Sequence, residues 1–344
     1  MKRLASVLPL APIALLLLAY GPAIKPLGPV TIGDGVTSHG TFDATEFAGT
    51  ADLFHAALEA GAGAVAVLPG TYAAPTVPVR LSGGSSVVGI GRVIVESGNA
   101  PAFAVSGPDV VLSGVTIRAT SRGAGPMVTA SVFQRVRLEA VRFLPAEGRT
   151  CVVASAGRAL DVLDCYAGPE DLSAGAGQAY AYRVLDLFDV ESGRIAGNVV
   201  LNLGDADRPV DAVVHADTSD HEGHHVRIEG NTVERIIRGA AGRVLRLVGG
   251  RFVTVTGNGI GRCPGDLPAI FLGPGGGHPG GPVVVTGNEI HNCGAPVVEV
   301  TSSKGAVVVG NGFGLLPPGT PAGGSVSVDA TSVGAVVADN SEGP

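Results

Sequence analysis

Short stretches in which apolar and polar residues alternate recur along the chain, and several of them end in Gly-Asn. One example is Val283-Val284-Val285-Thr286-Gly287-Asn288, with apolar residues three and five places before the Asn. The same pattern ends at Asn198, Asn231, Asn258, Asn311 and Asn340, and the equivalent earlier positions are Ile90, Val115, Val141 and Cys165. The repeat length varies from 23 residues (Asn288 to Asn311) to 33 residues (Asn198 to Asn231). Alternation with a period of two is typical of β-strands, and Gly and Asn are typical of turns.

Each repeat contains three short alternating stretches separated by turn residues. In the repeat that ends at Asn311 they are residues 297–301, 306–310 and 312–315. A unit of this size cannot bury its own apolar face, whereas stacked units share a continuous core. The sequence therefore predicts an all-β fold, a single-stranded right-handed parallel β-helix of about ten coils with a stacked asparagine ladder.

The N-terminal region differs from the repeats. Met1-Lys2-Arg3, the apolar residues 7–20 and the small residues Gly21-Pro22-Ala23 have the pattern of a signal peptide over residues 1–23. The alternative is an uncleaved anchor or an N-terminal arm packed on the domain. We expect one β-helix domain over residues 24–344 and a secreted, periplasmic or cell-surface location. Helical spacing of apolar residues over 50–62 predicts a short helix that caps the coil stack.

Several N-terminal segments together resemble the pectin-lyase-like superfamily. They are Gly33-Asp34-Gly35, the predicted helix, residues 68–72 (LPGTY) and the turn at residues 89–91. The resemblance spans residues 30–340 and implies a right-handed parallel β-helix. It also implies a binding groove along the first strand of each coil, because enzymes with this fold generally use that face.

Composition and charge limit the partners. The formal net charge is −7, and no run of basic residues follows Arg3, so we do not expect a nucleic-acid partner. No internal apolar run is long enough for a multi-pass membrane protein. The last repeat reaches the end of the sequence without a recognisable cap, and an uncovered strand edge favours pairing with another chain. A homo-oligomer contact through this end is therefore a further hypothesis.

Alternation within the first strand of each repeat separates inward from outward side chains. Leu185 and Leu187 point inward, so Asp186 points outward. The same counting gives an outward column, which consists of Thr129, Val153, Asp186, His215, Arg246, Phe271, Glu299 and Ser327. Asp217 and Phe188 follow on two of these strands, in the next column.

Four polar residues of this region are candidate catalytic residues: His215, Arg246, Asp186 and Asp217. Arg246 is suited to bind a uronate carboxylate, and His215 is suited to act as a general base oriented by Asp186. Alternatively, Asp186 and Asp217 are the acid and base of an inverting hydrolase. The simplest alternative is a solvated row of weak ion pairs. Candidate substrate-binding residues are Tyr182, Phe188, Phe271 and Glu299.

Residues 213–231 and 243–250 resemble part of the chondroitinase-B-type alginate lyases. That family cleaves uronate-containing polysaccharides by β-elimination, often with Ca²⁺, and uses a Lys/Arg pair as base and acid. This chain has no Lys between Lys25 and Lys304, so only Arg246 carries over. Residues 217–225 are rich in Asp, Glu and His, which makes Ca²⁺ a candidate cofactor, although no metal-ligand spacing is recognisable.

Two functions remain as hypotheses at this point. The first is an exported enzyme that cleaves an acidic polysaccharide by β-elimination or hydrolysis. The second is a non-catalytic β-helix surface, fibre or spike protein that binds glycans or has a structural role.

Two of the four cysteines occupy equivalent positions in neighbouring repeats. Cys263 and Cys293 each lie five residues after the Asn of their repeat, so their strands stack about 4.8 Å apart, within the range of a disulfide. They are a disulfide candidate, and a buried ladder of free thiols is the alternative. Cys151 and Cys165 occupy different parts of their coil and are not expected to pair.

Overall fold

The structure is a computed structural model, and the residues that it describes are 30–32, 64–67, 69–123, 125–171, 179–217, 225–249, 251–274, 281–293, 296–314 and 325–342. The predicted signal peptide (1–23) and capping helix (50–62) lie outside the described residues. Residues 218–224, which make up most of the acidic and histidine-rich turn, also lie outside the described residues, as do residues 275–280.

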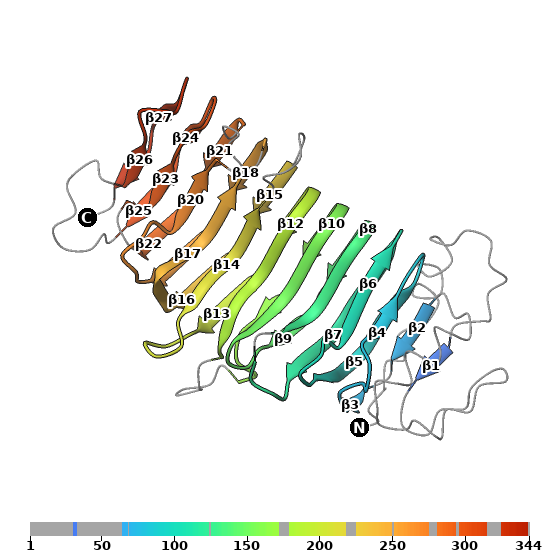
Figure 1. The fold of residues 1–344 in the computed structure, drawn as a ribbon. Helices are drawn as coiled ribbons and strands as arrows, with labels where there is room; N and C mark the ends of the chain where they lie inside the picture. Colours follow the sequence, from blue (N-terminus) through green and yellow to red (C-terminus); the bar gives the residue numbers. More distant parts are fainter. Residues whose placement is uncertain are drawn as a thin grey trace, which may run out of the picture.

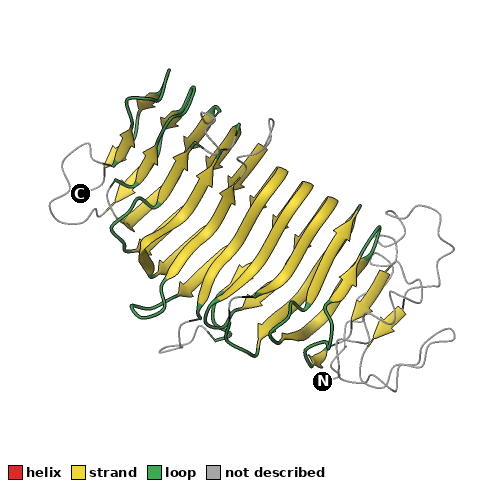
Figure 2. Ribbon diagram, viewed as in Figure 1, coloured by secondary structure: helices red, strands yellow, loops and turns green. Residues whose placement is uncertain are grey.

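The chain winds into a parallel β-solenoid, an all-β fold of about nine turns, as Figure 1 shows. All 28 strands belong to one continuous sheet, and the described residues contain no helix (Figure 2). The predicted parallel β-helix is confirmed, with about nine turns instead of the expected ten.

Each turn of the solenoid adds strands to three faces. The first face contains β4 (Val79–Leu81), β6 (Phe103–Gly107), β8 (Pro126–Glu139), β10 (Arg149–Leu163), β12 (Ala181–Ala196), β14 (Val210–Asp217), β17 (Arg238–Val248), β20 (Ile270–Gly273), β23 (Val298–Val300) and β26 (Val326–Val328). The long strands β8, β10 and β12 continue onto the second face.

The second face also contains β1 (Val30–Ile32), β2 (Ala64–Val67), β5 (Ser86–Ser97), β7 (Val110–Ala119), β15 (His225–Glu229), β18 (Phe252–Thr256), β21 (Val283–Thr286), β24 (Val307–Val309) and β27 (Val336–Ala338). The long strands β5 and β7 continue onto the third face. That face also contains β3 (Gly70–Tyr72), β9 (Arg142–Leu144), β11 (Tyr166–Ala167), β13 (Val199–Leu203), β16 (Thr232–Ile236), β19 (Gly259–Cys263), β22 (Glu289–Cys293), β25 (Gly312–Gly314) and β28 (Ser341–Glu342).

A column of asparagines links the turns between the second and third faces. The side-chain amide nitrogen of Asn258 donates to the side-chain oxygen of Asn288 at 2.9 Å, and the same bond repeats from Asn198 to Asn340. The residue before each buried Asn has a left-handed backbone, for example Gly257 with φ 63°. Glycine adopts this conformation without steric cost, which explains why the repeats end in Gly-Asn. The predicted asparagine ladder is confirmed.

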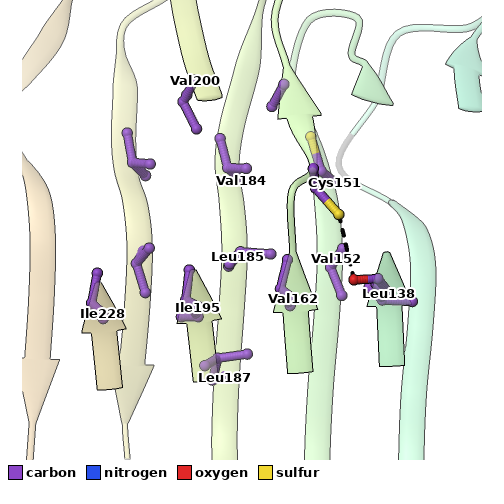
Figure 3. Packing of buried hydrophobic residues seen from close by; sticks show 14 of the residues in the cluster. Leu138, Cys151, Val152, Val162, Val184, Leu185, Leu187, Ile195, Val200 and Ile228 are labelled. Atoms are coloured by element: carbon purple, nitrogen blue, oxygen red, sulfur yellow. Dashed lines mark hydrogen bonds between the residues drawn. The ribbon is translucent and has the colours of Figure 1, made fainter. Parts of the chain in front are cut away.

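The core fills the inside of the solenoid with aliphatic side chains. Figure 3 shows Val184, Leu185 and Leu187 of β12 beside Val162, Ile195 and Ile228 of the second face. Val184 and Leu185 are adjacent in sequence and both buried, as are Val213 and Val214 on the next coil. Two successive buried residues mean that the strand bends at this point, so the inward and outward parity changes there.

The remaining expectations about the fold have mixed outcomes. No helix among the described residues is long and apolar enough to cross a membrane. Cys263 and Cys293 are register partners, as expected, and the structure holds both as buried free thiols. Val336 and Val337 of the last described coil are half exposed, and an oligomer contact there stays a prediction.

Candidate functional site

In the strand register of the first face, the residues of the predicted outward column lie in one row across the sheet. The Cα partners run from Thr129 to Val153, Asp186, His215, Arg246, Phe271, Glu299 and Ser327, each one strand from the next. Because neighbouring strands lie about 4.8 Å apart, side chains on adjacent strands of this row can contact one another. The candidate site is therefore built on regular, well-paired strands.

His215 and Asp186 form a hydrogen-bonded pair at the centre of the row. The Nδ1 atom of His215 lies 2.7 Å from Oδ1 of Asp186, and both side chains are largely buried, with 7 % and 11 % exposed. The edge of the Phe188 ring packs on the imidazole, with ring centroids 5.8 Å apart. The imidazole is thus fixed by a carboxylate on one side and an aromatic ring on another.

Arg183 joins this pair to a second carboxylate. Its Nη1 atom donates to both carboxylate oxygens of Asp186 at 2.9 Å, and its Nε atom donates to Oδ2 of Asp211 at 2.7 Å. Burial lowers the pKa of Arg183, but the hydrogen bonds and charges of Asp211 and Asp186 outweigh this effect and raise it. Arg183 is consequently a permanent cation at the base of the site.

The sequence argument missed Arg183 because simple alternation gives it the same parity as the inward Leu185. The bend at Val184 and Leu185 reverses that parity, so Arg183 and Asp186 both point to the outside although they are three residues apart. The signal was present as a pair of apolar residues at the same place in successive repeats, as in Val213-Val214 of the next coil.

The contacts around His215 favour one tautomer. Nη1 of Arg183 is also 2.9 Å from Nδ1 of His215, but a guanidinium only donates hydrogen bonds, and Nη1 already donates to both oxygens of Asp186. The shorter contact of Nδ1, at 2.7 Å, is to Asp186, and a carboxylate only accepts, so this contact is a hydrogen bond when the proton is on Nδ1. A neutral His215 with Nδ1 protonated has its lone pair on Nε2, which is the arrangement that a general base requires.

Two further arginines lie on the next strand, β17. Arg246 is the column residue beside His215, and Arg243 is the register partner of Ala212. The Arg243 guanidinium packs on the Phe271 ring, 4.5 Å from its centroid. Burial lowers the pKa of Arg243, the Glu299 carboxylate opposes this effect, and the positive charge of Arg246 adds to it.

Both of these arginines retain unused donors. The Nε atom of Arg243 is buried without an acceptor, and within the described ranges the Arg246 guanidinium forms no ion pair or hydrogen bond. The Arg246 guanidinium beside the cation of Arg243 suits a carboxylate or sulfate ligand.

The other predicted site residues lie around this cluster. Tyr182 is 46 % exposed and packs against Arg183, with the guanidinium carbon 5.1 Å from the ring centroid. Phe188 is 36 % exposed and is the register partner of Asp217. Glu299 is two strands beyond Arg246 and follows Phe271.

The geometry distinguishes between the two chemistries expected for the carboxylates. Both oxygens of Asp186 accept hydrogen bonds from Arg183, and one also contacts His215. An acceptor engaged in this way is not placed to give a proton to a glycosidic oxygen. Asp186 therefore fits the role of an orienting partner of His215 better than that of a hydrolase acid.

No group of three or more potential metal ligands occurs among the residues that the structure describes. Residues 218–224 lie outside them, so the calcium hypothesis for that turn stays a prediction.

Comparisons with known proteins do not assign this site. No protein-family model matches the chain, and a search of curated proteins found no match.

Proposed function

We propose that this protein is an enzyme that cleaves an acidic polysaccharide by β-elimination at the His215 cluster, meaning Arg183, Asp186, His215, Arg243 and Arg246. The observation that carries the proposal is the 2.7 Å pair of His215 and Asp186, with Arg246, which has no ion-pair partner among the described residues, on the adjacent strand. It combines an oriented base with a cation suited to an acidic sugar.

The proposed reaction begins with Arg246 and Arg243 holding the carboxylate of a uronate residue. The Nε2 atom of His215 removes the proton from the ring carbon next to that carboxylate. The negative charge that develops on the carboxylate oxygens is stabilised by the two guanidiniums. The electron pair then forms a carbon–carbon double bond and expels the glycosidic oxygen, which takes a proton from the imidazolium or from water.

Within this scheme Asp186 keeps His215 oriented and compensates the imidazolium charge. Arg183 in turn holds Asp186 through two hydrogen bonds and anchors the group to Asp211. Asp217, Tyr182, Phe188 and Phe271 are proposed to contact neighbouring sugar units. The exported location and a role for Ca²⁺ belong to the same proposal.

The second candidate is a glycan-binding protein without catalytic activity. It is favoured by the exposed rings of Tyr182 and Phe188, which flank the cluster and offer stacking surfaces for sugars. Both candidates use the same arginines, so they differ in bond cleavage and not in the location of the site.

The test is a degradation assay on a panel of uronate polysaccharides, which follows the ultraviolet absorbance of the unsaturated product and, in parallel, the release of reducing ends. We expect product with the wild type and none above background with His215→Gln or Arg246→Met. The matched controls are His291→Gln on the third face and Arg227→Met on the second face, which lie outside the His215 cluster and the acidic turn. Equal loss in the controls would contradict the location of the site. Binding without product would support the second candidate.

A further inference from the structure

Two thiols outside the proposed site meet on the third face. Cys263 ends β19, Cys293 ends β22, and the two residues are direct register partners on parallel strands. Neighbouring parallel strands are about 4.8 Å apart, which is inside the Cα separation that a disulfide spans. The Cα separation of these residues therefore permits a bond between them.

Both thiols lie in the interior, and no other cysteines of the described ranges are register partners. Cys263 is fully buried and Cys293 is 1 % exposed, and each thiol donates to a backbone oxygen of its own strand, Cys263 to Gly261 at 3.1 Å and Cys293 to His291 at 3.4 Å. Burial raises the pKa of Cys263. The neighbouring Cys263 thiol lowers the pKa of Cys293, and burial opposes this effect.

A buried cation stands beside the pair. Arg238 is 6 % exposed, and its Nε atom donates to the backbone oxygen of Cys263 at 3.0 Å while Nη1 donates to the backbone oxygen of Leu267 at 2.9 Å. No described acceptor contacts its Nη2 atom. A fixed guanidinium next to a thiol pair favours the thiolate form, which is the nucleophile in disulfide exchange.

We propose that Cys263 and Cys293 form a disulfide that joins two neighbouring coils when the chain folds in an oxidising environment. The structure holds the reduced form of the pair. With oxidised glutathione as the oxidant, the Cys293 thiolate attacks one of its sulfur atoms and releases one glutathione thiolate. The Cys263 sulfur, losing its proton, then displaces the second glutathione, so two protein thiols are oxidised and one glutathione disulfide is reduced to two thiols.

This proposal is independent of the proposed function, because neither cysteine belongs to the His215 cluster. The bond closes the chain segment from residue 263 to residue 293, which includes β20 and the column residue Phe271. Since both sulfur atoms are buried, the exchange takes place when the coils open locally, and reduction of the finished bond requires the same opening, which heating promotes.

The test is to refold the full chain in a glutathione redox buffer, select the fraction with a β-sheet spectrum, and unfold it in urea with a maleimide. The chain has four cysteines. We expect two maleimide labels by intact mass, four labels after prior reduction, and one cross-linked peptide pair containing Cys263 and Cys293. Cys151 and Cys165 are the internal control, because both are expected to be labelled. Four labels without prior reduction, or a bridge that includes Cys151 or Cys165, would overturn the proposal.

A variant separates the effect of the bond from that of the reductant. We expect a reductant to lower the thermal midpoint of the wild type by roughly 5–10 °C and to leave that of Cys263→Ala unchanged. An equal shift in both proteins would overturn the proposal. Peptide mapping of the wild type decides the question even if Cys263→Ala does not fold.

Discussion

Arg183 is the residue on which the geometry of the candidate site depends most, and its replacement gives a sharp prediction. The side chain is 13 % exposed and pairs with Asp186 and Asp211, which are 11 % and 18 % exposed. Replacing Arg183 by Met removes the cation and leaves both carboxylates in a largely buried position. Loss of one partner of a buried ion pair costs about 3–5 kcal/mol, so we expect Arg183→Met to lose stability on this scale.

The protein contains a matched control for burial. Arg194 and Glu229 form an ion pair with the same 2.7 Å separation of Nε and carboxylate oxygen as Arg183 and Asp211, but the side chains are 53 % and 32 % exposed. Because water screens an exposed pair, we expect Arg194→Met to have a denaturation midpoint close to that of the wild type. The two variants therefore make the same chemical change at the same distance and differ in burial and in the number of paired carboxylates, which is two for Arg183 and one for Arg194 among the described residues.

The assay is urea denaturation followed by circular dichroism. For Arg183→Met we expect the midpoint to fall by about 1 M or more, from a loss of 3–5 kcal/mol and a slope near 3 kcal/mol per M. Adding Asp211→Asn and Asp186→Asn to this variant should recover part of the loss, because no uncompensated charge then remains buried. If Arg183→Met lowers the midpoint no more than Arg194→Met does, the assignment of Arg183 as the organising cation is wrong.

The pH dependence of the stability of the wild type and Arg183→Met tests the direction of the Arg183 contribution. The pKa of Arg183 is raised in the folded protein, so its stabilisation is present throughout the neutral and acidic range and is lost only at strongly alkaline pH. In Arg183→Met this contribution is absent, so the deficit in stability relative to the wild type should stay constant across the neutral range and shrink only where strongly alkaline pH removes the charge of Arg183. A deficit that disappears on moving from neutral to mildly alkaline pH would contradict this reasoning.

Three further predictions concern the rest of the solenoid. Asn258 makes hydrogen bonds in both directions along the ladder, so Asn258→Ala should lower the free energy of unfolding in urea by about 3 kcal/mol or more. Asn340→Ala, at the less buried end of the ladder, should lower it less. Equal losses in the two variants would contradict the stabilising role of the ladder. Burial raises the pKa of Cys165 from 9.0 to about 12, so this thiol contributes stability that is complete below pH 9 and is lost between pH 9 and 12. In Cys165→Ser the free energy of unfolding should therefore fall less steeply with pH over this range than it does in the wild type. Hydrogen bonds from Thr331, Ser332 and Ser302 lower the pKa of Asp329 from 3.8 to about 2, so its stabilisation of the last coil is present above pH 3.8 and is lost as the pH falls toward 2. Hydrogen exchange of β26 should therefore increase between these pH values in the wild type. It should not increase in Asp329→Asn, because that variant has no carboxylate to protonate.

The residues of the first face show how much of the site could be predicted from the sequence. Strand alternation and the spacing from the asparagines were enough to place Asp186, His215 and Arg246 in one row, because stacked coils keep the same register over many repeats. The same spacing aligned Cys263 with Cys293. For Asp186, Arg246 and the two cysteines the local pattern repeats without interruption between the Asn and the residue, whereas a longer turn separates His215 from Asn231, so that residue was placed by strand alternation alone.

The residues that were missed lie where that regular pattern is interrupted. Arg183 and Arg243 precede a bend at which two adjacent apolar residues are buried, and the change of parity there is a property of the folded corner. The engagement of Asp186 by Arg183 was also beyond the sequence, since it depends on side chains that reach across the bend. These contacts favour the orienting role of Asp186 over its alternative role as an acid or base of a hydrolase.

The central claim is that the His215 cluster binds an anionic glycan, and equilibrium binding tests it most directly. Uronate oligosaccharides would be titrated by calorimetry into the wild type, Arg246→Met, Arg243→Met and the second-face control Arg227→Met. We predict binding by the wild type and Arg227→Met, with at least a tenfold weaker affinity in both first-face variants, since each loses a charge-assisted hydrogen-bond donor. Equal affinity in all four proteins, or no binding of any uronate oligosaccharide by the wild type, would contradict the account.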